Sequence, residues 1–247
     1  MPDSLGHRMK FGVIAPSTNT SVQPEFDAMA PPGITNHMSR IHVPDNPINN
    51  DDDFNKLVGE IADAQDAAID RLMTCHPGHI VMGISAETFW DGLEASKVLK
   101  KHIEKISGVG VTMGSESSQA ALNVYGAKKI AVVTPYQPVG DKNVKRFFEE
   151  CGFDVVRIKG LKAKSPVKIA HFSEDELRDA IVEVDGDDVD AIIQAGTNLA
   201  MARLAATAEH WLGKPVIAIN TATYWHALRT NGFDDTVQGF GTLLTKH

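Results

Sequence analysis

Five short stretches rich in hydroxyl, amide and glycine residues are the best candidates for chemistry. They are APSTNTS (15–21), MGISAETF (82–89), TPYQP (134–138), AGTN (195–198) and NTATYW (220–225). Their hydroxyl, amide and main-chain N–H groups can donate hydrogen bonds, while basic side chains are scarce in them. Donors of this kind, gathered near helix starts, bind anions. The stretches therefore predict a site for a carboxylate or an oxyanion.

Four side chains in these stretches or beside them are candidates for catalysis, namely Ser85, Tyr136, Glu87 and His226. Tyr136 follows a strand end directly and could donate a proton or orient a substrate, or it could pack as a lid with its hydroxyl in water. Glu87 could act as a general base if it is partly buried, or it could simply balance a helix dipole. His226 is expected one turn into a helix that begins at Thr221, close to the site.

The remaining candidates would bind the substrate. Gly83 and Gly196 would let the main chain approach a ligand closely, and Ser85, Thr197 and Asn198 would add donors at the following helix starts. The same residue types are also common as helix caps and strand ends, so capping alone is an alternative. Substrate contacts are expected from Pro16, Thr18, Asn19, Gly83, Ile84, Gly196, Thr197 and Asn198.

Short apolar, β-branched runs alternate with longer amphipathic stretches along the whole chain. This pattern predicts an α/β protein, with parallel strands joined by crossover helices. Strands are expected at 10–15, 36–43, 79–85, 108–113, 128–134, 154–160, 190–196 and 215–220. Helices are expected at 52–73, 92–105, 115–126, 141–152, 173–184, 198–213 and 221–232.

The two halves of the chain repeat one pattern. KFGVIAPSTN matches KIAVVTPYQP, HIVMGIS matches AIIQAGTN, and MGSESSQAALNVYG matches INTATYWHALRTNG, in the same order. The repeat predicts two pseudo-symmetric lobes, 1–116 plus 223–247 and 117–222, each a parallel sheet flanked by helices. Ligands of open parallel sheets bind beyond the carboxyl ends of the strands, so a site is expected in the cleft between the lobes.

Charge and composition exclude several classes of partner. The 247 residues carry a net charge of −8, which argues against nucleic acid or an anionic membrane as a partner but leaves room for a small anionic substrate. No signal-peptide pattern or apolar run of about 18 residues is present, so a cytoplasmic protein is expected. A homo-oligomer is compatible with the sequence, which leaves the oligomeric state open. Neither a metal-ligand spacing nor a nucleotide-binding glycine motif is found, and no metal or cofactor is expected.

These stretches give the chain a resemblance to a known family. VIAPSTNT (13–20), VMGISAETFWDG (81–92), VVTPY (132–136) and DAIIQAGTN (190–198) resemble the maleate cis–trans isomerase and arylmalonate decarboxylase branch of the aspartate/glutamate racemase superfamily. The resemblance implies a two-lobed fold with the site in the cleft and an enzyme that needs no cofactor. It also implies oxyanion binding by Ser85, Tyr136 and Thr197, and a substrate contact from Asn19.

The chain departs from that branch at the positions of its catalytic cysteines. By the resemblance, one or two thiols are expected there, and this chain has Gly83 and Gly196 instead. Gly196 is expected to keep the backbone geometry of the site while removing the thiol. Cys75 and Cys151, the two cysteines present, are expected at the opposite end of the sheets.

Three functions therefore stay open. The first is a cofactor-independent isomerase or decarboxylase of small carboxylates with an acid or base other than cysteine. The second is a hydrolase or hydratase in which Glu87 or His226 activates water, and the third is a carboxylate-binding protein without activity. The loop HVPDNPINNDDDF (42–54) could cover the cleft as a lid or could be an ordinary turn that caps the next helix.

Overall fold

All eight expected strands are present, and they form two separate parallel sheets. The structure is a computed structural model and describes residues 3–247. The first sheet contains β1 (Met9–Pro16), β2 (Ile34–Ile41), β3 (His79–Met82) and β4 (Gly110–Thr112). The second contains β5 (Lys129–Thr134), β6 (Asp154–Gly160), β7 (Ala191–Gln194) and β8 (Val216–Ala218). The α/β class expected from the alternating pattern is thus confirmed.

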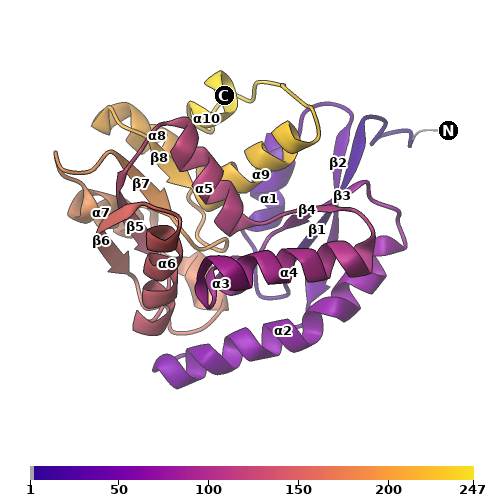
Figure 1. Cartoon of the computed structure of the whole chain (residues 1–247), viewed down its shortest axis with the longest axis horizontal. Coiled ribbons are helices and arrows are strands. Elements are labelled where there is room, and N and C mark those ends of the chain that lie inside the picture. Colours follow the sequence, from indigo (N-terminus) through magenta and orange to yellow (C-terminus); the bar gives the residue numbers. More distant parts are fainter. Residues whose placement is uncertain (1–2) are drawn as a thin grey trace.

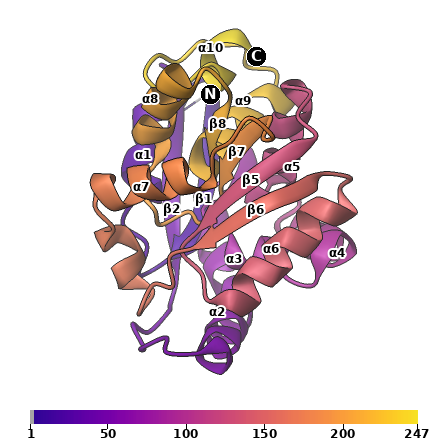
Figure 2. The same cartoon turned by 90° about the vertical axis from the view of Figure 1, so that its left-hand side faces the viewer.

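The two sheets have the same topology. The strand orders are β2-β1-β3-β4 and β6-β5-β7-β8, and every adjacent pair is parallel. Figure 1 shows the first sheet on the right and the second on the left, and Figure 2 shows the second sheet with its strands fanned side by side. The strands that matched in sequence, such as β1 with β5, hold equivalent places, so the repeat is a repeat of structure.

The helices connect and cover the strands. Their bounds are α1 (Val22–Met29), α2 (Asp51–Met73), α3 (Ala86–Phe89), α4 (Gly92–Ser107), α5 (Gly114–Val124), α6 (Pro138–Glu150), the 3-10 helix η1 (Val167–His171), α7 (Glu174–Val184), α8 (Ala202–Leu212), α9 (Ile219–Thr230) and α10 (Leu243–Lys246). The four elements α1, α3, η1 and α10 were not expected. Pro24 is tolerated in α1 because it lies in the first turn, where the missing N–H has no helical partner. No helix in residues 3–247 is both long and apolar enough to cross a membrane.

The loop at 42–50 ends in a helix cap. The Asn50 side chain accepts a hydrogen bond of 2.9 Å from the Asp53 N–H. Three aspartates occupy the first turn of α2, where their negative charges interact favourably with the positive end of the helix dipole. The same loop also reaches the second lobe, because the Ile48 N–H donates to the Lys164 carbonyl at 2.7 Å. Capping is therefore observed, and closure as a lid stays a prediction.

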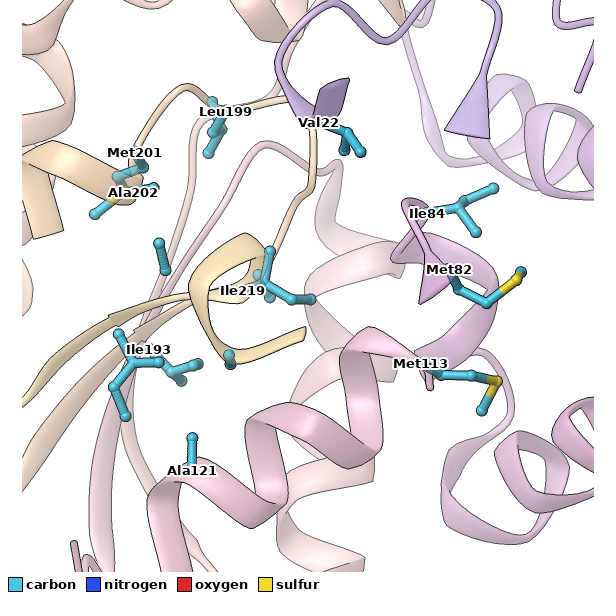
Figure 3. Close-up of a cluster of buried hydrophobic side chains, with 14 of the residues drawn as sticks. Val22, Met82, Ile84, Met113, Ala121, Ile193, Leu199, Met201, Ala202 and Ile219 are labelled. Carbon is cyan, nitrogen blue, oxygen red and sulfur yellow. The ribbon is translucent and has the colours of Figure 1, made fainter. Parts of the chain in front are cut away.

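One hydrophobic core joins the two lobes. Figure 3 shows Ile219 of α9 between side chains of the first lobe, such as Met82, and side chains of the second, such as Ile193. All three are fully or almost fully buried and belong to a single cluster. Gly114 permits this contact, because a Cβ there would lie 2.7 Å from Ile219 Cδ1. The lobes are therefore held in a fixed relation, which fixes the cleft between them.

The expected domain boundaries fall inside continuous helices. The boundary at 116/117 lies in α5 and the boundary at 222/223 lies in α9, and these two helices pack against each other between the sheets. Residues 1–2 of the expected first lobe lie outside the described part of the chain. The division into lobes is thus clear from the sheets, while the boundaries themselves stay a prediction.

Candidate active site

A small pocket, with a cavity volume of about 50 Å³, lies between the carboxyl ends of the two sheets. Its wall is formed by the loops after β1, β3, β5 and β7, by α2 and by the segment from Pro166 to Ile169. The lining residues are Pro16, Thr18, Asn19, Val43, Phe54, Leu57, Ile61, Ile84, Ser85, Ala86, Pro135, Tyr136, Pro166, Ile169, Gly196, Thr197 and Asn198. Its place beyond the carboxyl ends of two parallel sheets is where folds of this kind bind ligands.

The structure brings most of the expected site residues to this pocket. Those on its wall are Pro16, Thr18, Asn19, Ile84, Ser85, Tyr136, Gly196, Thr197 and Asn198. Gly83 lies immediately behind the wall, where its carbonyl accepts a hydrogen bond of 3.2 Å from Thr197 Oγ1. Glu87 and His226 are not on the wall. The parts that all these residues play in binding and catalysis stay predictions.

Ser85 and Tyr136 form a pair of hydroxyl groups from different lobes. Ser85 precedes α3 but makes no side-chain capping bond. Its Oγ lies 2.7 Å from Tyr136 Oη and accepts a hydrogen bond of 3.1 Å from the Thr197 N–H. Tyr136 is 4% exposed, so its hydroxyl is not in water. Helix capping therefore does not account for Ser85, and an exposed lid does not account for Tyr136.

Thr197 and Asn198 connect the second lobe to the loops of the first. The expected helix at 198–213 begins only at Ala202, so neither residue is a cap at its start. Instead, Asn19 Nδ2 donates to Thr197 Oγ1 at 3.2 Å, and the Thr20 N–H donates to Asn198 Oδ1 at 2.9 Å. The turn that carries them is thus held by hydrogen bonds across the cleft.

A buried carboxylate that the sequence did not suggest supports this turn from behind. Glu25 of α1 accepts hydrogen bonds from Asn220 Nδ2 at 2.6 Å and from the Ala202 N–H at 3.0 Å. Asn220 Nδ2 also donates to the Thr197 carbonyl at 2.9 Å. Burial raises the pKa of Glu25, although the hydrogen bond from Asn220 opposes that shift. Asn220 belongs to one of the five stretches noted in the sequence, whereas no sequence pattern marked Glu25 as part of a site.

The lining is poor in ionisable groups. Among the described residues, the wall contains no cysteine, histidine, aspartate, glutamate, lysine or arginine, and Tyr136 is its one titratable side chain. Burial raises the pKa of Tyr136 above its ordinary value. Tyr136 is therefore a neutral hydroxyl donor at physiological pH.

Gly196 has a backbone conformation that other residues rarely adopt. Its φ is +147°, and a Cβ built there would lie 2.4 Å from Cδ of Pro135. Gly83 is also confined, because a Cβ there would lie 2.6 Å from Val22 Cγ1. The expectation that Gly196 keeps the backbone geometry of the site while removing the thiol stays a prediction. In this loop the glycine is required by geometry.

Glu87 lies on α3 with its side chain buried away from the pocket. One carboxylate oxygen, Oε2, has no hydrogen-bond partner in the described part of the chain. Burial alone raises the pKa of Glu87 to about 8. A buried carboxyl group with this pKa is protonated at neutral pH, and it does not contact the space where a ligand would lie.

His226 is farther from the pocket than expected. Helix α9 begins at Ile219, directly after β8, and not at Thr221. His226 therefore lies two turns into the helix, about 10 Å along its axis from the first residue. Its Nδ1 is 3.1 Å from Ser117 Oγ on α5, and burial lowers its pKa. The expected position beside the site is corrected by this geometry.

Both cysteines lie away from the pocket wall. Cys75 follows α2, and its Sγ donates to the Leu72 carbonyl at 3.2 Å. Cys151 is the C-cap of α6, and burial raises the pKa of its thiol to about 11. A thiol with this pKa is protonated and unreactive at neutral pH.

Comparisons with known proteins agree with this fold. A sequence model described as arylmalonate decarboxylase matches residues 12–244. The chain is 25% identical over 250 residues to a maleate isomerase of Pseudomonas putida, covering 96% of this chain and 97% of that protein. A Nocardia farcinica maleate cis–trans isomerase variant, solved with a covalently bound succinylcysteine intermediate, has a TM-score of 0.89 at 19% identity, with 97% and 99% covered. Unliganded arylmalonate decarboxylase has a TM-score of 0.76 at 19% identity, with 96% and 98% covered.

The geometry of Gly196 can be tested by adding a side chain. Gly196→Ala is expected to lower the free energy of unfolding by about 2–4 kcal/mol, because it combines backbone strain with a clash against Pro135. Gly213→Ala is the matched control, since Gly213 also has positive φ, of +65°, but a Cβ there meets no atom within 4 Å. Urea unfolding should give the control a loss of only about 1 kcal/mol. Equal losses in the two variants would contradict the clash.

The pKa of Glu87 predicts a pH-dependent stability. Because this pKa is raised, the folded state binds the proton more tightly than the unfolded state, and the resulting stabilisation is complete below about pH 4.5 and lost as the pH rises toward 8. The free energy of unfolding of Glu87→Gln, relative to that of the wild type, should therefore rise by on the order of 4 kcal/mol between pH 5 and pH 9. Unfolding curves at several pH values would measure the difference, with the exposed Glu174→Gln as control. Parallel wild-type and variant curves would count against the buried acid.

Proposed function

Because the chain belongs to the arylmalonate decarboxylase family, we propose that it is a lyase that removes a carboxylate from a small substituted malonate through an enolate intermediate. One observation carries the proposal. The pocket offers hydroxyl and amide donors. Among the described residues, its wall has no thiol that could act as a nucleophile and no basic side chain next to a hydroxyl group that could activate it. Decarboxylation through an enolate needs stabilisation of developing charge and one proton, whereas covalent catalysis needs an activated nucleophile.

The residue types of the wall indicate the kind of substrate. Ser85, Tyr136, Thr197 and Asn19 are linked by hydrogen bonds and can hold a carboxylate or the oxygens of an enolate. Much of the remaining wall is apolar, including Val43, Phe54, Leu57, Ile61 and Ile169. A molecule that combines an anionic group with an aryl or alkyl group would match both kinds of lining.

The proposed reaction follows from this division. The bond between the central carbon and one carboxylate breaks, CO₂ leaves, and the electron pair of that bond forms the enolate of the remaining acid. Apolar surroundings favour conversion of the departing carboxylate into neutral CO₂. Tyr136 then donates its proton to the central carbon, and water returns a proton to the phenolate. Ser85 and the Thr197 N–H stabilise the enolate oxygens, and each donor is worth about 3 kcal/mol in comparable sites.

Maleate isomerisation is the second candidate, because the relative from Pseudomonas putida named above is a maleate isomerase. The related structure with a succinylcysteine intermediate shows a covalent thiol adduct in that protein. This chain has no cysteine on the pocket wall in residues 3–247, and Tyr136 is held neutral. Addition of a nucleophile to a double bond is therefore poorly supported here. A hydrolase that uses Glu87 or His226 to activate water has the same weakness, because neither residue lines the pocket.

The proposal is tested by turnover in D₂O. Incubation with phenylmalonate should release CO₂ and give phenylacetate with one deuterium on the central carbon, whereas maleate should not form fumarate. Proton NMR follows both reactions. Tyr136→Phe and Ser85→Ala should each lower kcat by about 10²–10³.

Tyr125→Phe is the matched control for the tyrosine variant. Its hydroxyl is also bonded, at 2.7 Å to Thr242 Oγ1, but it does not line the pocket, so kcat should be unchanged. Formation of fumarate without decarboxylation of any substituted malonate would overturn the proposal. Stabilisation by phenylmalonate with no product from it or from maleate would instead indicate a binding protein.

The absence of a catalytic thiol gives a further prediction. Complete alkylation of Cys75 and Cys151 by iodoacetamide in mildly denaturing buffer, followed by refolding, should leave turnover nearly unchanged. Mass spectrometry would count the alkyl groups, and Cys75→Ser/Cys151→Ser should behave in the same way. Full inactivation after one equivalent of reagent would show that a cysteine takes part.

A further inference from the structure

A strongly basic segment stands out in this acidic chain. Residues 157–171 contain one arginine, four lysines and one histidine but no aspartate or glutamate, although the net charge of the whole chain is −8. Arg157 and Lys159 are each paired with a carboxylate at 2.6 Å, Asp188 and Glu183 respectively. The other three lysines, Lys162, Lys164 and Lys168, have no carboxylate within 4.0 Å in the described part of the chain.

These three lysines line a common hollow, which we name the basic groove. It is open, has a cavity volume of about 380 Å³, and is lined by Leu161, Lys162, Ala163, Lys164, Lys168, His171, Phe172 and Glu176. Glu176 is the one acid among them, and its carboxylate is already bonded to the N–H and Oγ of Ser173 at 2.8 Å. Positive charge therefore exceeds negative charge in the groove.

The basic groove and the pocket share one segment, residues 164–169, as part of their walls. Pro166 and Ile169 line the pocket, while Lys164 and Lys168, on either side of Pro166 in the chain, line the groove. Figure 2 shows this segment between β6 and α7, near the loop at 42–50. The bond from the Ile48 N–H to the Lys164 carbonyl places it against that loop. An anion in the basic groove would thus be held next to the pocket.

An anionic substrate needs such help in this protein. A net charge of −8 repels anions at long range, and the pocket wall has no lysine or arginine among the described residues. Hydroxyl and N–H donors act only at contact distance. Unpaired lysines beside a pocket can attract an anion from solution and raise its rate of association by 10-fold or more.

We propose that the basic groove is a docking site for small carboxylates and other multivalent anions, from which the substrate passes into the pocket. The proposal rests on the function proposed above in so far as it concerns the substrate. The binding of anions itself does not depend on turnover. Since the lysines are exposed, salt must weaken the effect, and the Debye length of about 10 Å at 0.1 M sets the range.

The test compares two triple variants with the same change in net charge. Lys162→Gln/Lys164→Gln/Lys168→Gln removes the lysines of the basic groove. Lys101→Gln/Lys105→Gln/Lys128→Gln removes three exposed lysines elsewhere, none of which lies in the groove or in an ion pair within 4.0 Å in the described part of the chain. In 10 mM salt, the groove variant should lose 5- to 20-fold in kcat/KM for phenylmalonate with kcat unchanged, and the control should lose less than 2-fold. In 0.5 M salt the two variants should be equal.

A second measurement tests anion binding by the basic groove without any turnover. Inorganic pyrophosphate, titrated calorimetrically in 10 mM salt, should bind the wild type and the control alike and the groove variant at least 10-fold more weakly. Equal pyrophosphate affinity in all three proteins would overturn the docking site. Weaker pyrophosphate binding with unchanged kcat/KM would overturn its part in substrate capture. If phenylmalonate is not turned over at all, the proposed function fails, while calorimetry still decides whether the groove binds anions.

Discussion

The candidate site depends on one turn that crosses the gap between the two sheets. Thr197 and Asn198 belong to the second lobe, yet their side chains and main-chain groups bond to loops of the first. Because the lobes also share one hydrophobic core, these bonds form between parts that are already held together. Within this turn, the Thr197 N–H donates to Ser85 Oγ, and Ser85 Oγ contacts Tyr136 Oη. The turn thus adds a third group, the Thr197 N–H, to the pair of hydroxyl groups that meet across the cleft.

The wall of the candidate site presents neutral donors. Burial raises the pKa of Tyr136, so its hydroxyl is uncharged at neutral pH, and much of the remaining wall is apolar. Hydrogen bonds are stronger in such surroundings than in water, so a few fixed hydroxyl and N–H groups can stabilise a developing negative charge. The ionisable residues of the neighbourhood, Glu25 and Glu87, lie behind the wall. Glu25 accepts hydrogen bonds there from Asn220 and the Ala202 N–H, and the part that Glu87 plays stays a prediction.

The sequence predicted the fold well, because the signals were local. Apolar runs and the repeated pattern are visible within ten or twenty residues, and they gave eight strands and two lobes of equal topology. Most of the polar residues of the pocket were also found, since they follow strand ends. The misplaced parts depend on contacts between distant residues. Helix α8 begins at Ala202 because Thr197 and Asn198 bond across the cleft, and Glu25 could not be connected with Asn220 without the fold.

The contact between Gly196 and Pro135 has a consequence for how this chain can diverge. The proline ring occupies the space that a side chain at 196 would need, and the two residues lie in the loops that follow the neighbouring strands β5 and β7. A side chain at position 196 is therefore acceptable only after Pro135 has been replaced, whereas position 135 can change while Gly196 is present. A lineage that passes between a loop with a side chain at 196 and this loop must alter both positions. The order of the two changes is also constrained, since the proline has to go first.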